Sequence, residues 1–244
     1  MPNDLGRCVI RYARLIHSDL AHLREEMVGI LQGHGGRLSV GTIMGAVPML
    51  MRALGRLRCK QPELSVEIVE DTSARLLGLV DQGRLDLAIC RSSVSQRPDA
   101  YDCLTLHPEQ LTVVAHPDHP ARAAAKLELA DLSIYRWVVY PANMPMRLLL
   151  EREFSQCGLE FPRYPVETAS TFTMLSLLQE DSELVAVMPL AVAEFSEKFG
   201  MIRRLPLELL SRSEPYGVIT RYGSTLSAAA HLLLKELQTE QLSV

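Results

Sequence analysis

An alternation of apolar residues at steps of four and three constrains this chain more than any other feature of its sequence. The residues are Val9, Ala13, Ile16, Leu20, Leu23, Met27 and Ile30, and the glycines between 33 and 36 follow them. Apolar a and d positions over three heptads give a helix one narrow apolar stripe that a partner helix can cover. We therefore expect a linker helix over residues 1–34 that mediates self-association. The alternative is a helix that packs on the chain's own body.

Composition limits the class of protein. The chain has 244 residues, of which 48% are hydrophobic and 22% are charged. This is typical of a soluble globular chain of one or two domains, with a core large enough to fold without disulfides. The net charge of −4 comes from 25 basic and 29 acidic residues. Such a balance gives no electrostatic case for nucleic-acid binding by this chain.

Cysteine usage and apolar runs bear on the compartment. The five cysteines are odd in number and scattered, without a C-x-x-C motif: Cys8, Cys59, Cys90, Cys103 and Cys157. We interpret them as reduced thiols. Charged residues interrupt the first apolar stretches, so no secretory signal is expected. The longest apolar runs are about ten residues, too short for a bilayer. We expect a cytoplasmic protein with no membrane partner.

Beyond Gly36 the pattern is that of strands alternating with helices. The first set comprises strands at 37–41, 64–70 and 85–89, with helices at 46–57 and from Asp71-Thr72-Ser73 to Gly83. In the strand at 64–70, Leu64, Val66 and Ile68 share one face. A second set comprises strands at 111–115, 137–140, 164–167 and 184–188, with helices at 146–157, 170–179 and up to Phe199. A last strand at 216–220 and a helix at 226–237 return to the first set. This rhythm predicts two α/β lobes built on parallel strands.

Hydroxyl-bearing segments follow several of these strands. They are Thr42-Ile43-Met44, Asp71-Thr72-Ser73, Cys90-Arg91, Tyr140 to Asn143 and Thr168 to Thr171. Ligands bind beyond the carboxyl ends of parallel strands, where backbone N–H groups at helix starts attract anions. Any one hydroxyl there can be only a helix N-cap. Their recurrence in both lobes favours a shared cleft for a small organic anion, such as a carboxylic acid or a sugar acid.

Signatures of catalysis and metal binding are missing from the sequence. The glycines do not make G-x-G-x-x-G, and no Walker A, G-x-S-x-G or H-E-x-x-H motif occurs. His116 and His119 are three residues apart, but Pro117 and Pro120 make their segment a loop. Cys90 beside Arg91 is interpreted as a packed small thiol rather than a reactive one. We expect no enzyme activity, no cofactor and no metal.

Several segments in this order carry a resemblance to a known family. They are Arg37 to Gly41, Pro62 to Val66, Gly83 to Ile89, His119-Pro120-Ala121, Asp131-Leu132 to Trp137, and Leu184 to Pro189. Taken together they resemble the effector-binding half of LysR-type transcriptional regulators over nearly the whole chain. The resemblance implies two Rossmann-like lobes, as in type II periplasmic binding proteins, preceded by a long linker helix. It also implies that a small effector binds between the lobes.

The resemblance further assigns domains, partners and site residues. It gives lobe I as residues 37–109 plus 219–244 and lobe II as 110–218. It implies dimers or tetramers, with DNA bound only through a winged helix-turn-helix that this chain lacks. Arg147 is expected to cap or support the loop before it. The alternative is a solute-binding transport protein of the same fold. The implied effector-binding residues are Thr42, Ile43, Met44, Ser73, Cys90, Arg91, Pro141, Asn143, Met144, Ser170, Thr171 and Phe172.

Overall fold

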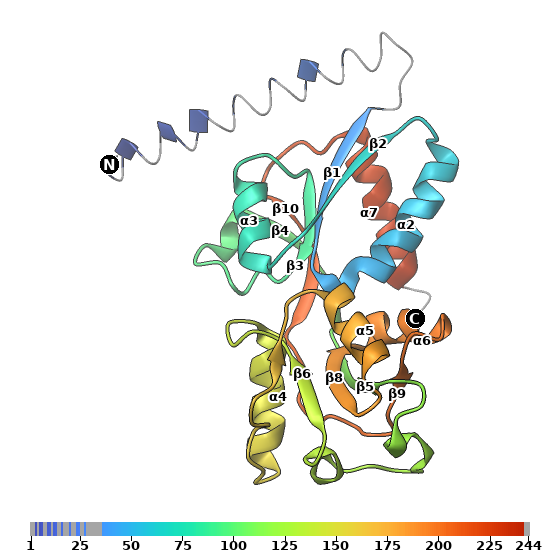
Figure 1. Cartoon of the computed structure of the whole chain (residues 1–244). Helices are drawn as coiled ribbons and strands as arrows, with labels where there is room; N and C mark the ends of the chain where they lie inside the picture. The colour runs from blue at the N-terminus through green and yellow to red at the C-terminus, as the bar shows by residue number, and fades with distance from the viewer. Residues whose placement is uncertain are drawn as a thin grey trace. The chain divides into compact units, whose positions relative to one another are not determined.

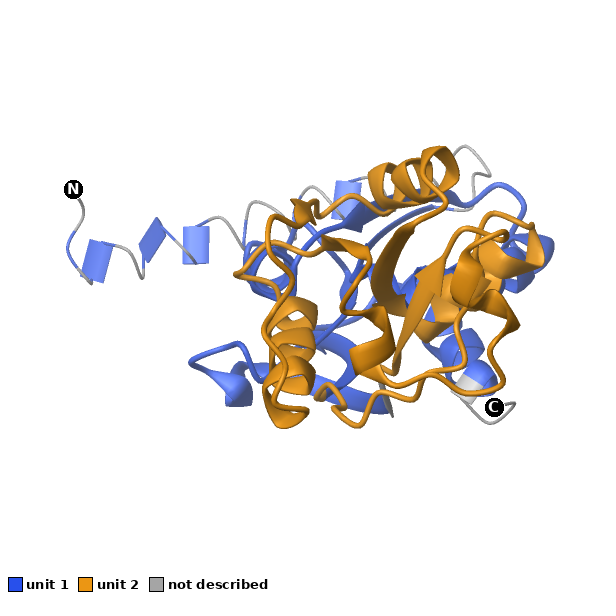
Figure 2. Ribbon diagram, turned by 60° about the horizontal axis from the view of Figure 1, so that its bottom comes forward, with its two compact units in different colours: residues 1–107, 215–244 blue, residues 108–214 orange. Residues whose placement is uncertain are grey.

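The computed structural model describes residues 36–241, apart from the side chains of residues 107, 108 and 241, and scattered positions among the first 30 residues. The chain divides into two compact units (Figure 2). Unit 1 comprises Met1–His107 and Pro215–Val244, and unit 2 comprises Pro108–Glu214. Each unit contains one five-stranded sheet flanked by helices (Figure 1).

Unit 1 is built on three parallel strands. Its sheet has the order β2-β1-β3-β10-β4, in which β1 pairs in parallel with β2 and β3, and β10 is antiparallel to β3. The helix α3 lies on one face, and α2 and α7 lie on the other (Figure 1). The elements are β1 (Arg37–Thr42), η1 (Met44–Ala46), α2 (Val47–Lys60), β2 (Ser65–Glu70), α3 (Ser73–Asp81), β3 (Leu87–Cys90), η2 (Pro98–Ala100), β4 (Tyr101–Pro108), β10 (Pro215–Arg221) and α7 (Ala228–Gln241).

The interior strand β1 is in close contact with the segments around it. The Asp86 carboxylate accepts a hydrogen bond from the Ser39 N–H at 2.7 Å, and the Asp86 N–H donates to the Ser39 carbonyl at 2.9 Å. At Gly41 a Cβ would lie 2.7 Å from Leu85 and 2.8 Å from Leu76 of α3. Glycine at this position therefore lets α3 approach the sheet closely.

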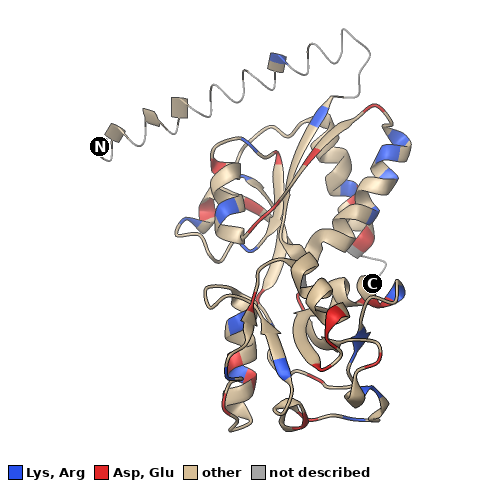
Figure 3. Ribbon diagram, viewed as in Figure 1, with Lys and Arg blue, Asp and Glu red and all other residues tan. Residues whose placement is uncertain are grey.

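The two helices α2 and α7 are joined by a cluster of ion pairs. Arg52 contacts Glu240 at 2.7 Å, Arg56 contacts Glu236 at 2.9 Å and also Glu240, and Lys60 contacts Glu236 at 2.5 Å. Figure 3 shows the basic residues of α2 near the acidic residues of α7. The basic side chains are 38–63% exposed, so each pair adds little stability by itself. The cluster links α2 to the last helix of the unit, α7.

Unit 2 repeats the same plan with other segments. Its sheet has the order β7-β6-β8-β5-β9, with β6 parallel to β7 and β8, and β5 antiparallel to β8 and β9. In its core the Trp137 and Phe154 rings meet edge to face at 5.4 Å. The elements are β5 (Leu111–Ala115), η3 (Pro120–Ala123), η4 (Leu129–Leu132), β6 (Arg136–Val139), α4 (Pro145–Gln156), β7 (Val166–Glu167), α5 (Thr171–Glu180), β8 (Leu184–Pro189), α6 (Leu190–Lys198) and β9 (Arg203–Arg204).

The sequence pattern and the structure differ mainly at sheet edges. The edge strands β4 and β9 carry no predicted counterpart. The predicted strand at 164–167 shortens to β7 because Tyr164 adopts a φ of 57° and is 97% exposed. Leu64, the residue before β2, is buried, but Ile68 within β2, an edge strand with a neighbour on one side only, is 43% exposed. Alternation of apolar residues in the sequence therefore shows which side chains share a face of an edge strand, but it does not show whether that face is buried.

Most of the predicted N-terminal seam falls on described residues. Val9, Ala13, Ile16, Leu20, Leu23 and Met27 have helical backbone, whereas Ile30 lies outside the described residues. The five larger side chains are 53–67% exposed. The stripe is therefore not covered within the described part of the chain, and self-association through it remains a prediction.

Candidate ligand-binding site

The predicted site residues of unit 1 lie together at the carboxyl ends of its parallel strands. Thr42 is the last residue of β1 and pairs with Glu70, the last residue of β2. The Ile43 N–H donates to the Ile89 carbonyl of β3 at 2.9 Å, and the Arg91 N–H donates to the Ser73 Oγ at 3.2 Å. The segments that follow three parallel strands are therefore bonded to one another at the carboxyl ends of those strands.

These residues of unit 1 are all buried. The exposed fractions are 0% for Thr42 and Cys90, 6% for Ile43 and Arg91, and 8% for Met44 and Ser73. The Thr42 hydroxyl donates to the Ile43 carbonyl at 3.0 Å, so it is already used inside the unit. Burial raises the pKa of the Cys90 thiol to about 12, with a smaller contribution from Cys103. Cys90 is therefore a packed thiol and not a nucleophile at neutral pH.

The predicted site residues of unit 2 also lie together at the carboxyl ends of two parallel strands, β6 and β7. The last residues of β6 and β7, Val139 and Glu167, are register partners, and the Thr168 N–H donates to the Val139 carbonyl at 3.0 Å. Pro141 to Met144 follow β6 as a turn closed by a 2.9 Å bond from the Met144 N–H to the Pro141 carbonyl. Ser170 to Phe172 follow β7 and begin α5.

The strand-end residues of unit 2 are more exposed than those of unit 1. Asn143 and Ser170 are exposed, Pro141, Met144 and Thr171 are half-buried, and Phe172 is 77% exposed. The Ser170 Oγ accepts a bond from the Thr173 N–H at 3.2 Å, which makes Ser170 the N-cap of α5. Capping occupies one lone pair of that hydroxyl and leaves its own O–H able to bond elsewhere.

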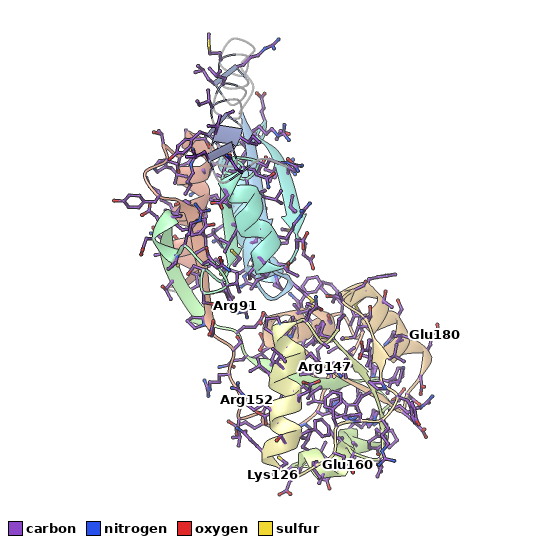
Figure 4. All side chains as sticks on the ribbon, turned by 90° about the vertical axis from the view of Figure 1, so that its left-hand side faces the viewer. Arg91, Lys126, Arg147, Arg152, Glu160 and Glu180 are labelled. Atoms are coloured by element: carbon purple, nitrogen blue, oxygen red, sulfur yellow. The ribbon has the colours of Figure 1, made fainter. Side chains whose placement is uncertain are left out.

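Arg147, in the first turn of α4, supports the loop before it as the sequence suggested. Its guanidinium donates to the Tyr140 carbonyl at 3.2 Å and to the Glu167 carboxylate at 2.8 Å. It also pairs with Glu151 at 2.6 Å and lies 4.3 Å from the centre of the Phe161 ring. Figure 4 labels Arg147 beside α4. Burial alone would lower the pKa of Arg147, but the bonds to Glu167 and Glu151 raise it. The ion pair between Arg147 and Glu167 could not be predicted from the sequence, which shows only that Glu167 lies at the end of a predicted strand.

The histidine pair found in sequence has backbone partners. The His116 Nδ1 accepts from the Asp118 N–H at 2.9 Å, and the His119 Nδ1 accepts from the Ala121 N–H at 3.0 Å. The His119 ring packs 4.4 Å from that of Tyr135. Among the residues that the structure describes, no group of three or more His, Cys, Asp or Glu side chains is placed to hold a metal ion.

None of the described helices combines the length and the apolar character that a membrane span needs.

The fold and its strand ends define a class of protein. Each unit has an α/β sheet in which three strands are parallel, with hydroxyls and helix starts at the carboxyl ends of those strands. Two such units, connected by two chain crossings, are the plan of two-lobe α/β ligand-binding proteins.

Comparison with known proteins identifies the family. Residues 31–241 match the model of the LysR substrate binding domain. The chain is 31% identical over 239 residues to the HTH-type transcriptional regulator GbpR of Azospirillum brasilense, covering 97% of this chain and 70% of the relative. It is 28% identical over 240 residues to the HTH-type transcriptional regulator GalR of Pseudomonas putida, covering 96% and 58%. The chain belongs to the LysR substrate binding domain family.

Solved structures of this family share the fold. The effector binding domain of QuiR in complex with shikimate superimposes with a TM-score of 0.65 at 16% identity, over 86% of this chain and 98% of that one. This confirms the expected α/β fold of two Rossmann-like units, of the type II periplasmic-binding-protein kind. The curated relatives are regulators of transcription and not transport proteins. The transport alternative is therefore not supported.

Proposed function

We propose that this chain is the effector-sensing and self-associating part of a LysR-type transcriptional regulator. In this proposal a small organic metabolite, a carboxylic acid or a sugar acid, contacts the strand-end residues of both units. The observation that carries the proposal is the family match over residues 31–241. The meeting of the predicted residues at the strand ends within each unit supports it.

The preference for an anion follows from the groups at these edges. Four helices begin there, namely η1, α3, α4 and α5, and the N–H groups of a helix's first turn lack partners within the helix. Hydroxyl and amide side chains of Asn143, Ser170 and Thr171 add neutral donors. Arg147 is neutralised by Glu151 and Glu167, so anion binding in unit 2 would rest on the helix starts and the neutral donors.

Signalling would follow from unequal binding to two conformations. An effector shifts an equilibrium only by the difference between its affinities for the two states. The exposed apolar stripe of the N-terminal helix would pass the change to a second copy in a dimer or tetramer. Operator binding is assigned to a helix-turn-helix segment of the intact regulator, since the net charge of this chain is −4.

The effector proposal is tested by thermal shift with benzoate, shikimate and gluconate as probes. A ligand at a hundredfold excess over its Kd adds about 2.7 kcal/mol, which raises the Tm of a chain of this size by roughly 5–10 °C. Ser170→Val and Thr171→Val are expected to fold and to lose the shift. The matched control Ser155→Val, at an exposed serine of α4, keeps it. The proposal fails if no acid of this kind stabilises the protein, or if both variants keep the full shift.

Self-association is tested separately by sedimentation equilibrium. Leu20→Glu combined with Leu23→Glu places charges on the predicted seam, and the expected result is a monomer. Leu210→Glu, at a leucine that is 74% exposed in unit 2, is the matched control and leaves the oligomer intact. A wild-type chain that sediments as a monomer would contradict this part of the proposal.

A further inference from the structure

The contacts of Arg147 reach two separate strands of unit 2. Its side chain is only 11% exposed, although it lies in the first turn of a surface helix. One guanidinium nitrogen donates both to the carbonyl of Tyr140, at 3.2 Å, and to the carboxylate of Glu167, at 2.8 Å. Tyr140 is the residue after β6, and Glu167 is the last residue of β7. A single side chain therefore joins the points where two strands end.

Two candidate ligand-binding segments start at those points. Residues 141–144 follow Tyr140, and residues 168–172 follow Glu167. The two strands share only a short ladder, in which Val138 pairs with Val166 and Val139 with Glu167. A ladder of two residue pairs fixes the relative position of the following segments weakly. The guanidinium adds a second link directly at the base of both.

The residues around Arg147 hold its guanidinium in one orientation and neutralise its positive charge. Glu151 accepts from the Nε at 2.6 Å, while the Phe161 ring lies 4.3 Å from the guanidinium carbon. A planar guanidinium can bond to several acceptors in its plane while an aromatic ring covers its face, and an ammonium group cannot. Two carboxylates balance its one positive charge. Arg147 is therefore occupied by protein groups and is not a free counter-charge for an anionic effector.

We propose that Arg147 is a positioning residue that couples residues 141–144 to residues 168–172, so that the two segments order and loosen together. The assignment of these segments as effector contacts rests on the proposed function, but the coupling itself does not. Arg147 contacts β7 through the Glu167 carboxylate, so this carboxylate is the route by which Arg147 passes a change after one strand to the other.

Hydrogen exchange followed by mass spectrometry tests the coupling on the full chain without ligand. In Arg147→Gln we expect amides of both segments to exchange about tenfold faster, since charge-assisted hydrogen bonds are lost. In Arg147→Lys the acceleration is smaller, because one contact at a time can be kept. The decisive variant is Glu167→Gln, which alters only the end of β7 and should still accelerate exchange of residues 142–144.

A matched control removes an arginine ion pair elsewhere in the same unit. Arg136→Gln breaks the exposed pair with Asp181 and should leave both segments unchanged. The proposal is overturned if Glu167→Gln leaves residues 142–144 at the wild-type rate, or if Arg147→Gln accelerates only α4. Benzoate, shikimate and gluconate give an independent readout, in which Arg147→Gln should reduce any wild-type thermal shift more than Arg147→Lys does. If the wild type responds to none of them, the proposed function fails while the exchange data still decide the coupling.

Discussion

The sheets of units 1 and 2 have the same kind of strand order, but the residues at their carboxyl strand ends differ in burial. In unit 1 Thr42, Ser73 and Cys90 are buried and bonded within the unit. In unit 2 Ser170 and Phe172 are exposed, and the segments that carry them are fixed from outside their strands by Arg147. The strand ends of unit 1 are part of its core, whereas those of unit 2 lie at the surface and are held in place by the Arg147 side chain.

This difference separates two roles that one fold can give to the same kind of residue. A buried strand-end hydroxyl contributes to stability, so its replacement is expected to weaken the unit. An exposed strand-end residue costs little to replace, and its effect is expected on ligand binding. On the proposed function, the strand-end residues of unit 1 would be preformed contacts, and those of unit 2 adjustable ones.

The largest expected effect comes from breaking the sheet that supports the edge of unit 1. At Gly217 of β10, the neighbour of β3, a Cβ would lie 2.6 Å from the Leu104 carbonyl oxygen and 2.8 Å from the Cys103 sulfur. Gly217→Ala must shift backbone and should cost about 3 kcal/mol of unfolding free energy in urea. Gly55→Ala, in the middle of α2 with nothing within 4 Å of its Cβ, should stabilise by about 0.5–1 kcal/mol. Equal effects of the two substitutions would refute the tight packing of β10.

A smaller effect should distinguish the two serines that start α3 and α5. Ser73→Ala removes the acceptor of the buried Arg91 N–H and should cost about 2 kcal/mol. Ser170→Ala removes an exposed N-cap and should cost about 1 kcal/mol. Urea unfolding of both variants measures the difference. If Ser170→Ala proves the more destabilising, the contrast between a buried edge and an open edge is wrong.

Acid should weaken unit 2 through His119, which caps η3 and is fully buried. Burial lowers the pKa of His119, and His116 adds to this while Glu183 opposes it. The unfolded chain then binds the proton more readily, so stability is full above pH 6.5 and falls below it, by at most about 1.4 kcal/mol per pH unit. Urea unfolding between pH 5 and pH 8 should show a shallower slope in His119→Gln than in wild type, with His231→Gln, at an exposed histidine, as the control. An unchanged slope in His119→Gln would exclude this histidine as the cause.

The sequence predicted the interior strands of each sheet well because buried strands leave a clear apolar signature. Val113 and Val187 are fully buried in strands whose predicted bounds match closely. The pattern failed at β4 and β9, which are edge strands and depend on pairing with distant residues rather than on their own composition. For the candidate site, the rule that ligands bind at the carboxyl ends of parallel strands predicted which segments lie together within each unit. It could not separate buried Ser73 from exposed Ser170, because both look like helix N-caps in sequence.

The smallest effect on stability is expected at Phe172, where the comparison between the units is sharpest. Its ring is 77% exposed in the first turn of α5, so Phe172→Ser should change the unfolding free energy by less than about 0.5 kcal/mol. If the open edge of unit 2 contacts the effector, the same variant should lose much of the thermal shift given by an aromatic acid such as benzoate. Phe199→Ser, at a ring that is 63% exposed directly after the end of α6, is the control and should keep that shift. Loss of stability without loss of the shift would mean that Phe172 supports the fold, and unit 2 would then resemble unit 1 after all.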